Sequence, residues 1–374
     1  MLRFVPALLC AVALAAHADD TLEPLGLGLE GFPYPHEVRY LPLEMEGERV
    51  AMAYMDVAPT GKPNGRTALL LHGRNFFGAY WKDTIDFLSS AGWRVVVPDQ
   101  IGFGKSSKPD QPLSFHGLAR ENKRLLDSLG VEKVDLIAHS MGGMLAVRFA
   151  LMYPGAVDRL VLEDPIGLED YRLMVPYASR EQLAAESRAQ TRASIDRFFR
   201  AYFTRWDDRF QIYADVAWRW MLGPEAERLH RVAANTYTMA YEQPVLYELP
   251  QIRQRTLIVV GSRDRTALGR NRVSPQVRET MGHMPELARA AASAMPHCNV
   301  VVIDDVGHIP HLEATDRFHA VLFSFLALSE GATLDSRAFP AGGDSTAVRA
   351  ESGGMRSAAL QGGGDTSRSV ADGR

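Results

Sequence analysis

From residue 67 onward, short apolar runs rich in β-branched residues alternate with longer segments whose apolar residues recur at helical spacing. The strand-like runs are residues 67–71, 93–97, 134–138, 160–162, 256–260 and 299–303. The helix-like segments include residues 80–91, 115–129 and 143–152. Apolar strands that alternate with helices are typical of a parallel sheet covered by helices on both faces. The sequence therefore predicts an α/β fold with a mostly parallel central sheet.

Two segments depart from this alternation. Residues 38–43 and 50–57 alternate apolar and polar side chains, which predicts an antiparallel hairpin at the sheet edge. Residues 165–251 contain no strand-like run but hold several tryptophans and helix-favouring stretches such as residues 180–192. We interpret this segment as a helical cap inserted over the carboxyl edge of the sheet. An ordinary set of packing helices is the alternative.

The N-terminus has the pattern of an export signal. Arg3 is followed by an apolar stretch and by the small-x-small sequence Ala16-His17-Ala18. The stretch is shorter than the roughly 20 apolar residues that a transmembrane helix needs. We therefore expect residues 1–18 to be cleaved and the protein to be periplasmic or secreted, with no membrane span afterwards. A retained anchor and a lipid anchor at Cys10 are the alternatives.

Composition divides the remainder of the chain. Gly, Ser, Ala, Asp and Arg dominate residues 329–374, which predicts a disordered tail. The folded core is then expected to comprise residues 19–164 and 252–328, on either side of the cap. Basic and acidic residues number 41 and 45 and form no long run of one sign, which argues against a nucleic-acid partner.

Cys298 is the one cysteine left after removal of the predicted signal, so no intramolecular disulfide is expected. It stands at the start of a strand-like run. That position favours a buried, inert thiol over a nucleophile.

The most specific motif lies in residues 134–143, where an apolar strand runs into a turn of the form small-x-Ser-x-Gly and then into a helix. Such a nucleophile elbow presents a serine hydroxyl, here that of Ser140, at the edge of a sheet. Ala138 and Gly142 are small because the tight turn leaves no room for larger side chains. The helix beginning near Met141 directs backbone N–H groups at developing negative charge. The alternative is a strand–helix turn without catalysis.

With this elbow, the chain resembles the α/β-hydrolase superfamily over residues 38–328, in the branch with a serine nucleophile and an inserted cap. A His72-Gly73 pair after the strand at residues 67–71 is similar to that family's oxyanion loop. The resemblance implies that the backbone N–H groups of Arg74 and Met141 hold the oxyanion. The Arg74 side chain is interpreted either as a cap-facing or surface charge or as a contact to a substrate carboxylate.

The Asp99-x-x-Gly-x-Gly-x-Ser loop also matches the family and is taken as structural. It lacks the third glycine and the following acid of a dinucleotide-binding fingerprint.

Two further loops hold candidates for the other catalytic groups. Asp264 follows the strand at residues 256–260, and His308 follows the strand at residues 299–303. The chain order Ser, Asp, His is the one that this fold uses. A serine hydroxyl needs a histidine to take its proton, and the histidine needs an acid to orient it. We therefore predict Ser140 as nucleophile, His308 as general base and Asp264 as the acid.

Several rivals stay open for these roles. Glu163 and Asp164 follow an earlier strand at a position that some relatives use for the acid. His311 lies three residues after His308 and is interpreted as packing or capping the next helix. His139 is expected in the core, and His72 is expected to make a structural hydrogen bond.

A serine at the elbow argues against haloalkane dehalogenases and epoxide hydrolases, which carry an aspartate there. The first hypothesis is a carboxylic-ester hydrolase acting on a small molecule through an acyl-serine. The alternatives are hydrolysis of a C–C bond next to a carbonyl, as in meta-cleavage-product hydrolases, and a non-catalytic ligand-binding protein. A proline iminopeptidase is less favoured because its oxyanion loop differs.

Aromatic residues of the cap, Trp218, Trp220, Tyr237 and Tyr241, either line a substrate pocket or form the core of the cap itself. His308 and His311 have a spacing that metal ligands can use, but no other ligands converge on them in sequence, so neither a metal nor a cofactor is predicted.

Overall fold

The computed structural model describes residues 22–329, 332, 334 and 339. The signal peptide predicted at residues 1–18 and nearly all of the tail predicted at residues 329–374 lie outside this part. Among the helices that are described, none combines the length and the apolar character needed to span a bilayer.

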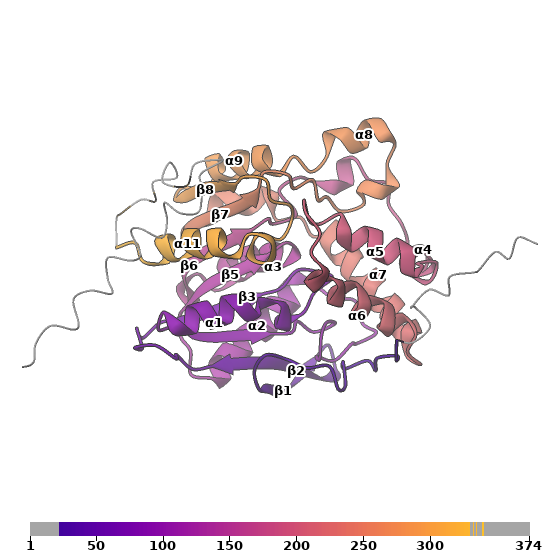
Figure 1. The fold of residues 1–374 in the computed structure, drawn as a ribbon, viewed down its shortest axis with the longest axis horizontal. Helices are drawn as coiled ribbons and strands as arrows, with labels where there is room; N and C mark the ends of the chain where they lie inside the picture. The colour runs from indigo at the N-terminus through magenta and orange to yellow at the C-terminus, as the bar shows by residue number, and fades with distance from the viewer. Residues whose placement is uncertain (1–21, 330–331, 333, 335–338, 340–374) are drawn as a thin grey trace, which may run out of the picture.

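An eight-stranded sheet forms the centre of the described chain, with the strands in the order β1-β2-β4-β3-β5-β6-β7-β8 (Figure 1). The strands are β1 Val38–Met45, β2 Glu48–Val57, β3 Thr67–Leu71, β4 Arg94–Pro98, β5 Val134–His139, β6 Val157–Glu163, β7 Arg255–Gly261 and β8 Cys298–Ile303. β1 and β2 pair antiparallel at one edge, which confirms the predicted hairpin. From β4 to β8 every pair is parallel. The predicted α/β fold with a mostly parallel sheet is confirmed.

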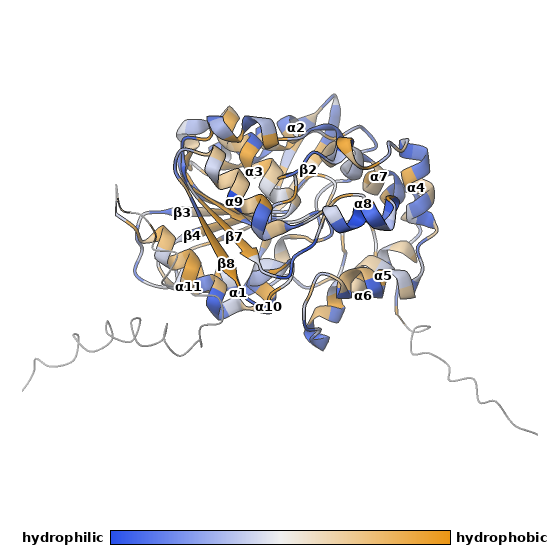
Figure 2. Cartoon of the chain, turned by 90° about the horizontal axis from the view of Figure 1, so that it is seen from above, coloured by the Kyte–Doolittle hydropathy of each residue, from blue (hydrophilic) through white to orange (hydrophobic). Residues whose placement is uncertain are grey.

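Helices cover both faces of the sheet. The helices outside residues 165–251 are α1 Lys82–Ser90, α2 Phe115–Ser128, α3 Met141–Met152, α8 Pro275–Thr280, α9 Met284–Ala294, α10 Pro310–Glu313 and α11 Thr315–Leu326. Figure 2 shows α2, α3 and α9 on one side of the strands and α1 and α11 on the other. Successive strand residues point to opposite faces and pack into two separate hydrophobic cores. Leu69 packs in the core under α2 and α3, whereas Leu70 packs in the core under α1 and α11.

The interval between β6 and β7 holds four helices and no strand. They are α4 Arg180–Arg188, α5 Arg192–Arg200, α6 Gln211–Met221 and α7 Ala226–Glu242, grouped at one end of the sheet (Figure 1). We call residues 165–251 the cap segment. The helix-favouring stretch at residues 180–192 is not one helix, because Thr191 and Ser194 form a capping box that starts α5 separately.

The N-terminal segment, residues 22–35, ties the cap segment to the core. The Leu25 N–H donates to the Arg219 carbonyl at 3.0 Å, and the Trp220 indole N–H donates to the Gly26 carbonyl at 3.0 Å. On the core side, the Tyr34 hydroxyl donates to Asp99 at 2.6 Å. This contact also involves the loop predicted to be structural, in which Asp99 accepts hydrogen bonds from the backbone N–H groups of Gly78 and Lys105.

Candidate active site

Ser140, Asp264 and His308 come together at the carboxyl edge of the sheet, because each follows the end of a parallel strand. His308 Nε2 lies 3.0 Å from the Ser140 hydroxyl oxygen, and His308 Nδ1 lies 2.8 Å from Asp264 Oδ2. Ser140 is 7% exposed, whereas Asp264 and His308 are 2% and 1% exposed. The three groups therefore form a continuous hydrogen-bonded relay that ends on a hydroxyl at the margin of the buried core.

The turn that carries Ser140 is strained and tightly packed. Ser140 has φ 56° and ψ −120°, which a residue with a side chain rarely adopts. A Cβ added at Gly142 would lie 2.5 Å from the Leu71 carbonyl oxygen, so a larger residue there would push α3 away from β3. The turn therefore holds the serine hydroxyl outward at the start of α3.

Asp264 is held in its charged form. Burial alone would raise the pKa of its carboxyl group, but His308 and hydrogen bonds from Asp164 and the Thr266 N–H leave the pKa below its ordinary value. Asp164 is the converse case, since burial, the nearby charge of Asp264 and their hydrogen bond raise its pKa well above the ordinary value. The pair consequently shares one proton, with Asp164 donating to Asp264.

A metal ion could in principle be held by Asp164, Asp264 and His308. One carboxylate oxygen or ring nitrogen from each of them lies within 4.8 Å of the other two. These atoms are engaged with one another and with neighbouring protein groups. Asp164 accepts from the Gly261 N–H at 3.1 Å, and His308 bridges Asp264 and Ser140. The chemistry of the set is that of a proton relay.

The oxyanion loop lies beside Ser140. A Cβ added at Gly73 would lie 3.1 Å from the Ser140 Cβ, so the backbone of this loop passes directly over the serine. Within the described residues, the backbone N–H groups of Arg74 and Met141 donate to no protein acceptor. These two donors are therefore free for an oxygen that develops negative charge near Ser140.

A chain of hydrogen bonds behind Ser140 joins the oxyanion loop to the histidine loop. The Gly73 N–H donates to the Tyr80 hydroxyl at 2.9 Å, and that hydroxyl lies 3.1 Å from His139 Nδ1. His139 Nε2 lies 2.8 Å from the His308 carbonyl oxygen. Because a carbonyl only accepts, His139 donates from Nε2 and accepts the Tyr80 proton at Nδ1. Burial lowers the pKa of His139 to about 3, which agrees with this neutral ring.

The rival residues have partners of their own. The Glu163 carboxylate lies 2.9 Å from His311 Nδ1 and accepts from the His311 backbone N–H at 2.7 Å. His311 stacks on the Trp81 ring with centroids 4.1 Å apart. His72 accepts from the Gln100 N–H at 3.0 Å, in line with the structural bond expected of it. The geometry places Asp264, rather than Glu163 or Asp164, against His308.

Tyr202 of the cap segment also reaches this site, although no sequence pattern pointed to it. Its ring stacks on the His308 imidazole with centroids 4.9 Å apart, and its carbonyl accepts from the His308 N–H at 2.7 Å. Its hydroxyl accepts from the Asn75 side chain at 2.7 Å. Tyr80 was likewise missed. Tyr202 lies far from the catalytic motifs in sequence, and Tyr80 follows the oxyanion loop without belonging to a motif, so only tertiary packing identifies their contacts at the site.

The four cap aromatics have separate surroundings. The Tyr237 ring lies under the Arg74 guanidinium at 5.7 Å, whereas the Tyr241 hydroxyl donates to the Val175 carbonyl at 2.9 Å. Trp220 packs against Phe77 and the N-terminal segment, and Trp218 packs against the core. Of the four, Tyr237 is the one that contacts the oxyanion loop.

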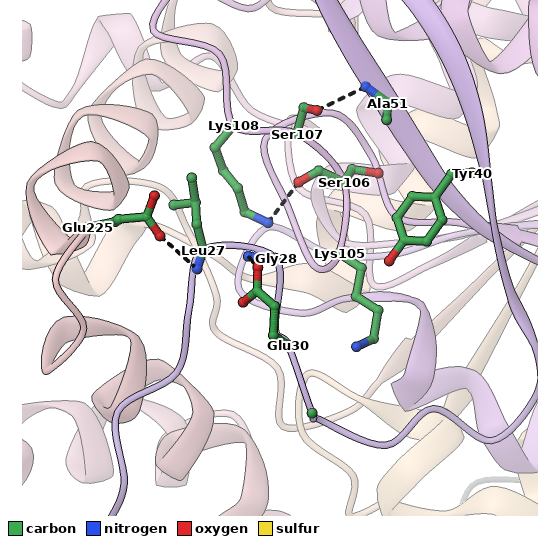
Figure 3. A pocket seen from close by; sticks show the side chains of 11 residues that line it. Leu27, Gly28, Glu30, Tyr40, Ala51, Lys105, Ser106, Ser107, Lys108 and Glu225 are labelled. Carbon is green, nitrogen blue, oxygen red and sulfur yellow. Dashed lines mark hydrogen bonds between the residues drawn. The ribbon is translucent and has the colours of Figure 1, made fainter.

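A cavity of about 680 Å³ lies away from the relay, between the N-terminal segment and residues 105–108 (Figure 3). Its polar groups bond to the protein itself. Lys108 donates to the Ser106 carbonyl at 2.8 Å, Ser107 accepts from the Ala51 N–H at 2.9 Å, and Glu225 accepts from the Leu27 N–H at 3.2 Å. These contacts hold the N-terminal segment in place.

Cys298 is partly buried, and burial raises the pKa of its thiol to about 12. The thiolate is therefore scarce at neutral pH, in agreement with the inert thiol expected from the sequence.

The chain is similar to known α/β hydrolases in sequence and in structure. A family model described as the alpha/beta hydrolase fold matches residues 69–315. A crystal structure of a "probable hydrolytic enzyme" from Pseudomonas aeruginosa PAO1 is 40% identical, with a TM-score of 0.80, and the match covers 82% of this chain and 99% of that chain.

Two curated relatives match over shorter stretches. An epoxide hydrolase 2 of Siraitia grosvenorii is 38% identical over 109 residues, which is 29% of this chain and 34% of the relative. A 2-hydroxy-6-oxononadienedioate/2-hydroxy-6-oxononatrienedioate hydrolase of Paraburkholderia phymatum is 38% identical over 128 residues, which is 33% of this chain and 43% of the relative. Each match therefore spans less than half of the curated relative.

Proposed function

The chain belongs to the α/β-hydrolase family, and on that premise we propose that it is a serine hydrolase that cleaves small carboxylic esters through an acyl-serine intermediate at Ser140. One observation carries the proposal. His308 links the Ser140 hydroxyl, at 3.0 Å, to the Asp264 carboxylate, at 2.8 Å, in a buried relay. Epoxide hydrolases resemble this chain, but they are expected to carry an aspartate where Ser140 stands.

In the first half of the reaction, the Ser140 oxygen attacks the ester carbonyl while His308 Nε2 takes the hydroxyl proton. Asp264 stabilises the imidazolium that forms, because its carboxylate bonds His308 Nδ1 and stays ionised. The backbone N–H groups of Arg74 and Met141 bind the oxyanion. Each such donor stabilises the transition state by about 3–4 kcal/mol. His308 then returns the proton to the departing alcohol.

In the second half, His308 takes a proton from water, and the resulting hydroxide attacks the acyl-serine carbonyl. Collapse of the second tetrahedral intermediate breaks the bond to the Ser140 oxygen, releases the carboxylic acid and returns the proton to the serine. The same two N–H groups bind the oxyanion in both halves, so no additional group is required.

A chain-length series of p-nitrophenyl esters tests the proposal. We expect Ser140-dependent turnover with a burst of p-nitrophenol that matches the enzyme concentration if deacylation is the slower step. Ser140→Ala is expected to lower kcat by about 10⁶-fold. Ser293→Ala, at an exposed serine on α9, is the matched control. Turnover that persists in Ser140→Ala, or a folded protein without activity on any ester, would refute the proposal.

Hydrolysis of a C–C bond next to a carbonyl is the second candidate, favoured by the 38% identity to the oxononadienedioate hydrolase. It uses the same serine and oxyanion donors. A protein that is inactive on esters but cleaves a vinylogous 1,5-diketone with loss of activity in Ser140→Ala would establish this alternative.

We also propose that residues 1–18 direct export. The supporting observation is the basic, apolar and small-residue order of this segment. N-terminal sequencing of the protein recovered from the periplasm or medium should begin at Asp19.

A further inference from the structure

The Arg74 guanidinium bonds to neutral groups of α7. Its Nε donates to the Thr236 hydroxyl at 3.2 Å, and its Nη2 donates to the Ala233 carbonyl at 2.9 Å. Among the described residues no acidic side chain forms an ion pair with it, and the neutral ring of Tyr237 lies 5.7 Å from the guanidinium carbon. Burial lowers the pKa of this guanidinium. Arg74 is partly buried, and a bound anion stabilises a partly buried cation that has no counter-ion.

The remaining donors of Arg74 have room for a ligand. A guanidinium carries five N–H groups, and the two bonds to α7 use the N–H of Nε and one of the two on Nη2. Nη1 donates to no described residue, and it is not fully buried. Nη1 therefore faces accessible space, while the two bonds to α7 hold the guanidinium plane in a fixed orientation.

Tyr202 adds a second unused donor. Its hydroxyl oxygen accepts from the Asn75 side chain at 2.7 Å, so the proton of the same hydroxyl is left to donate elsewhere. Within the described residues this proton has no acceptor. Asn75 follows Arg74 in the oxyanion loop, so its bond to Tyr202 places the Tyr202 hydroxyl against the loop that carries Arg74.

Both side chains adjoin the reacting groups. Arg74 supplies one of the two free N–H groups beside Ser140, and the Tyr202 ring stacks on His308 at 4.9 Å. We infer that Arg74 and Tyr202 form a subsite for a carboxylate of the substrate, so that the preferred esters carry a negative charge near the scissile bond. The guanidinium can only donate, and the Tyr202 hydroxyl, whose oxygen already accepts from Asn75, has its proton left to donate. Two such donors suit a carboxylate and find no acceptor on an apolar group.

This inference rests on the proposed ester hydrolysis and names its substrate class. A different role for Arg74 would be to tether the oxyanion loop to α7 with no ligand contact. The two roles differ in one respect, because loss of a tether slows neutral and charged esters alike, whereas loss of a carboxylate subsite slows charged esters selectively.

The test compares matched ester pairs that differ in one charge. In the first pair, mono-p-nitrophenyl adipate is measured against the same compound with its free carboxylate methylated. In the second pair the carboxylate is on the alcohol side, as 4-carboxyphenyl butyrate against its methyl ester. The wild-type protein is expected to favour the carboxylate in at least one pair by about tenfold or more in kcat/KM, since hydrogen bonds to charged groups are stronger than neutral ones.

Three variants then locate the preference. Arg74→Gln should abolish it by raising KM for the charged ester, Arg74→Lys should retain part of it, and Tyr202→Phe should reduce it. Arg197→Gln, at an exposed arginine on α5, is the control for a change of charge on the cap segment. If Arg74→Gln does not fold, Arg74→Lys and Tyr202→Phe still report on the subsite.

Each outcome decides one question. Ser140-dependent turnover of neutral esters without any charge preference overturns the carboxylate subsite and leaves the proposed function standing. A preference that survives in Arg74→Gln also overturns it. Absence of Ser140-dependent turnover on every ester refutes the proposed function and this inference with it.

Discussion

The His308 backbone N–H donates to the Tyr202 carbonyl at 2.7 Å, and the Tyr202 ring stacks on the His308 imidazole with centroids 4.9 Å apart. Residue 308 follows β8, whereas residue 202 belongs to the cap segment. The close approach extends to Gly307, where an added Cβ would lie 2.3 Å from the Tyr202 carbonyl oxygen. The cap segment is thus built into the support of the histidine.

Replacement of the Tyr202 ring should therefore impair the general base. We expect Tyr202→Leu to keep the backbone bond but to release the imidazole, lowering kcat on neutral esters by about ten- to a hundredfold, because small misplacements of catalytic groups are that costly. Tyr202→Phe keeps the stacked ring and should retain more of kcat. Steady-state kinetics on p-nitrophenyl butyrate compares the two, and equal kcat values would contradict a positioning role for the ring.

Glu313 makes a second connection between the same two segments. Its carboxylate accepts from the Thr204 and Arg205 N–H groups at 2.8 and 3.0 Å, and from the Gly307 N–H at 2.8 Å. We expect Glu313→Ala to remove three hydrogen bonds to a charged carboxylate and to lower the free energy of unfolding by about 1–3 kcal/mol. Denaturant unfolding measures the loss, and the exposed Glu286→Ala on α9 is the control.

The Tyr80–His139 contact predicts a pH effect on stability. The folded pKa of His139 is about 3, below its ordinary value of 6.5, because the ring is buried. A depressed histidine pKa contributes stability that is present above 6.5 and is lost as the pH falls toward 3. His139→Gln should therefore show a flatter dependence of Tm on pH across this interval than the wild-type protein. Parallel curves would contradict the assignment of a neutral His139.

Much of the fold could be read from local patterns, because a strand buried on both faces must be apolar throughout. β3 begins and ends where the apolar run does, at Thr67 and Leu71. Helix boundaries in the cap segment were less predictable. Residues 180–192 favour a helix everywhere, yet the side chain of Thr191 starts a new one by capping α5. Whether one helix continues or a second begins depends on tertiary packing, which helix propensity does not describe.

The candidate site likewise has residues that the sequence located and residues that it did not. Sequence could place Ser140, Asp264 and His308 after parallel strands, whose carboxyl ends share one edge. It favoured Asp264 as the acid but left Glu163 and Asp164 as alternatives, because these also follow a strand at that edge and only the tertiary arrangement sets which carboxyl meets His308. Tyr202 left no local signal at all, since a stacked aromatic in a helical insertion looks like any core residue.

The Asp164–Asp264 pair supports the last prediction. Asp164 is protonated, donates to Asp264, and accepts from the Gly261 N–H at 3.1 Å. An asparagine can reproduce both bonds, its amide group donating to Asp264 and its oxygen accepting from residue 261. We therefore expect Asp164→Asn to retain most of kcat, whereas Asp264→Asn should lower kcat by about 10⁴-fold through loss of the charged acid that orients His308.

The same pair predicts how stability changes with pH. The folded pKa of Asp164 is raised well above 3.8, because the group is buried beside another carboxylate. A raised acid pKa contributes stability that is present below 3.8 and is lost as the pH rises toward the folded value. The asparagine side chain of Asp164→Asn stays neutral at every pH. The Tm of this variant minus the wild-type Tm should therefore increase as the pH rises from about 4 to 8. The pKa of Asp264 is lowered, so its contribution to stability is fully present above 3.8 and is lost only as the pH falls below that value. The difference in Tm between Asp264→Asn and the wild-type protein should therefore stay constant from about pH 4 to 8. A constant difference in Tm between Asp164→Asn and the wild-type protein would mean that Asp164 is ionised in the folded state. Such a result would contradict the proton shared by Asp164 and Asp264.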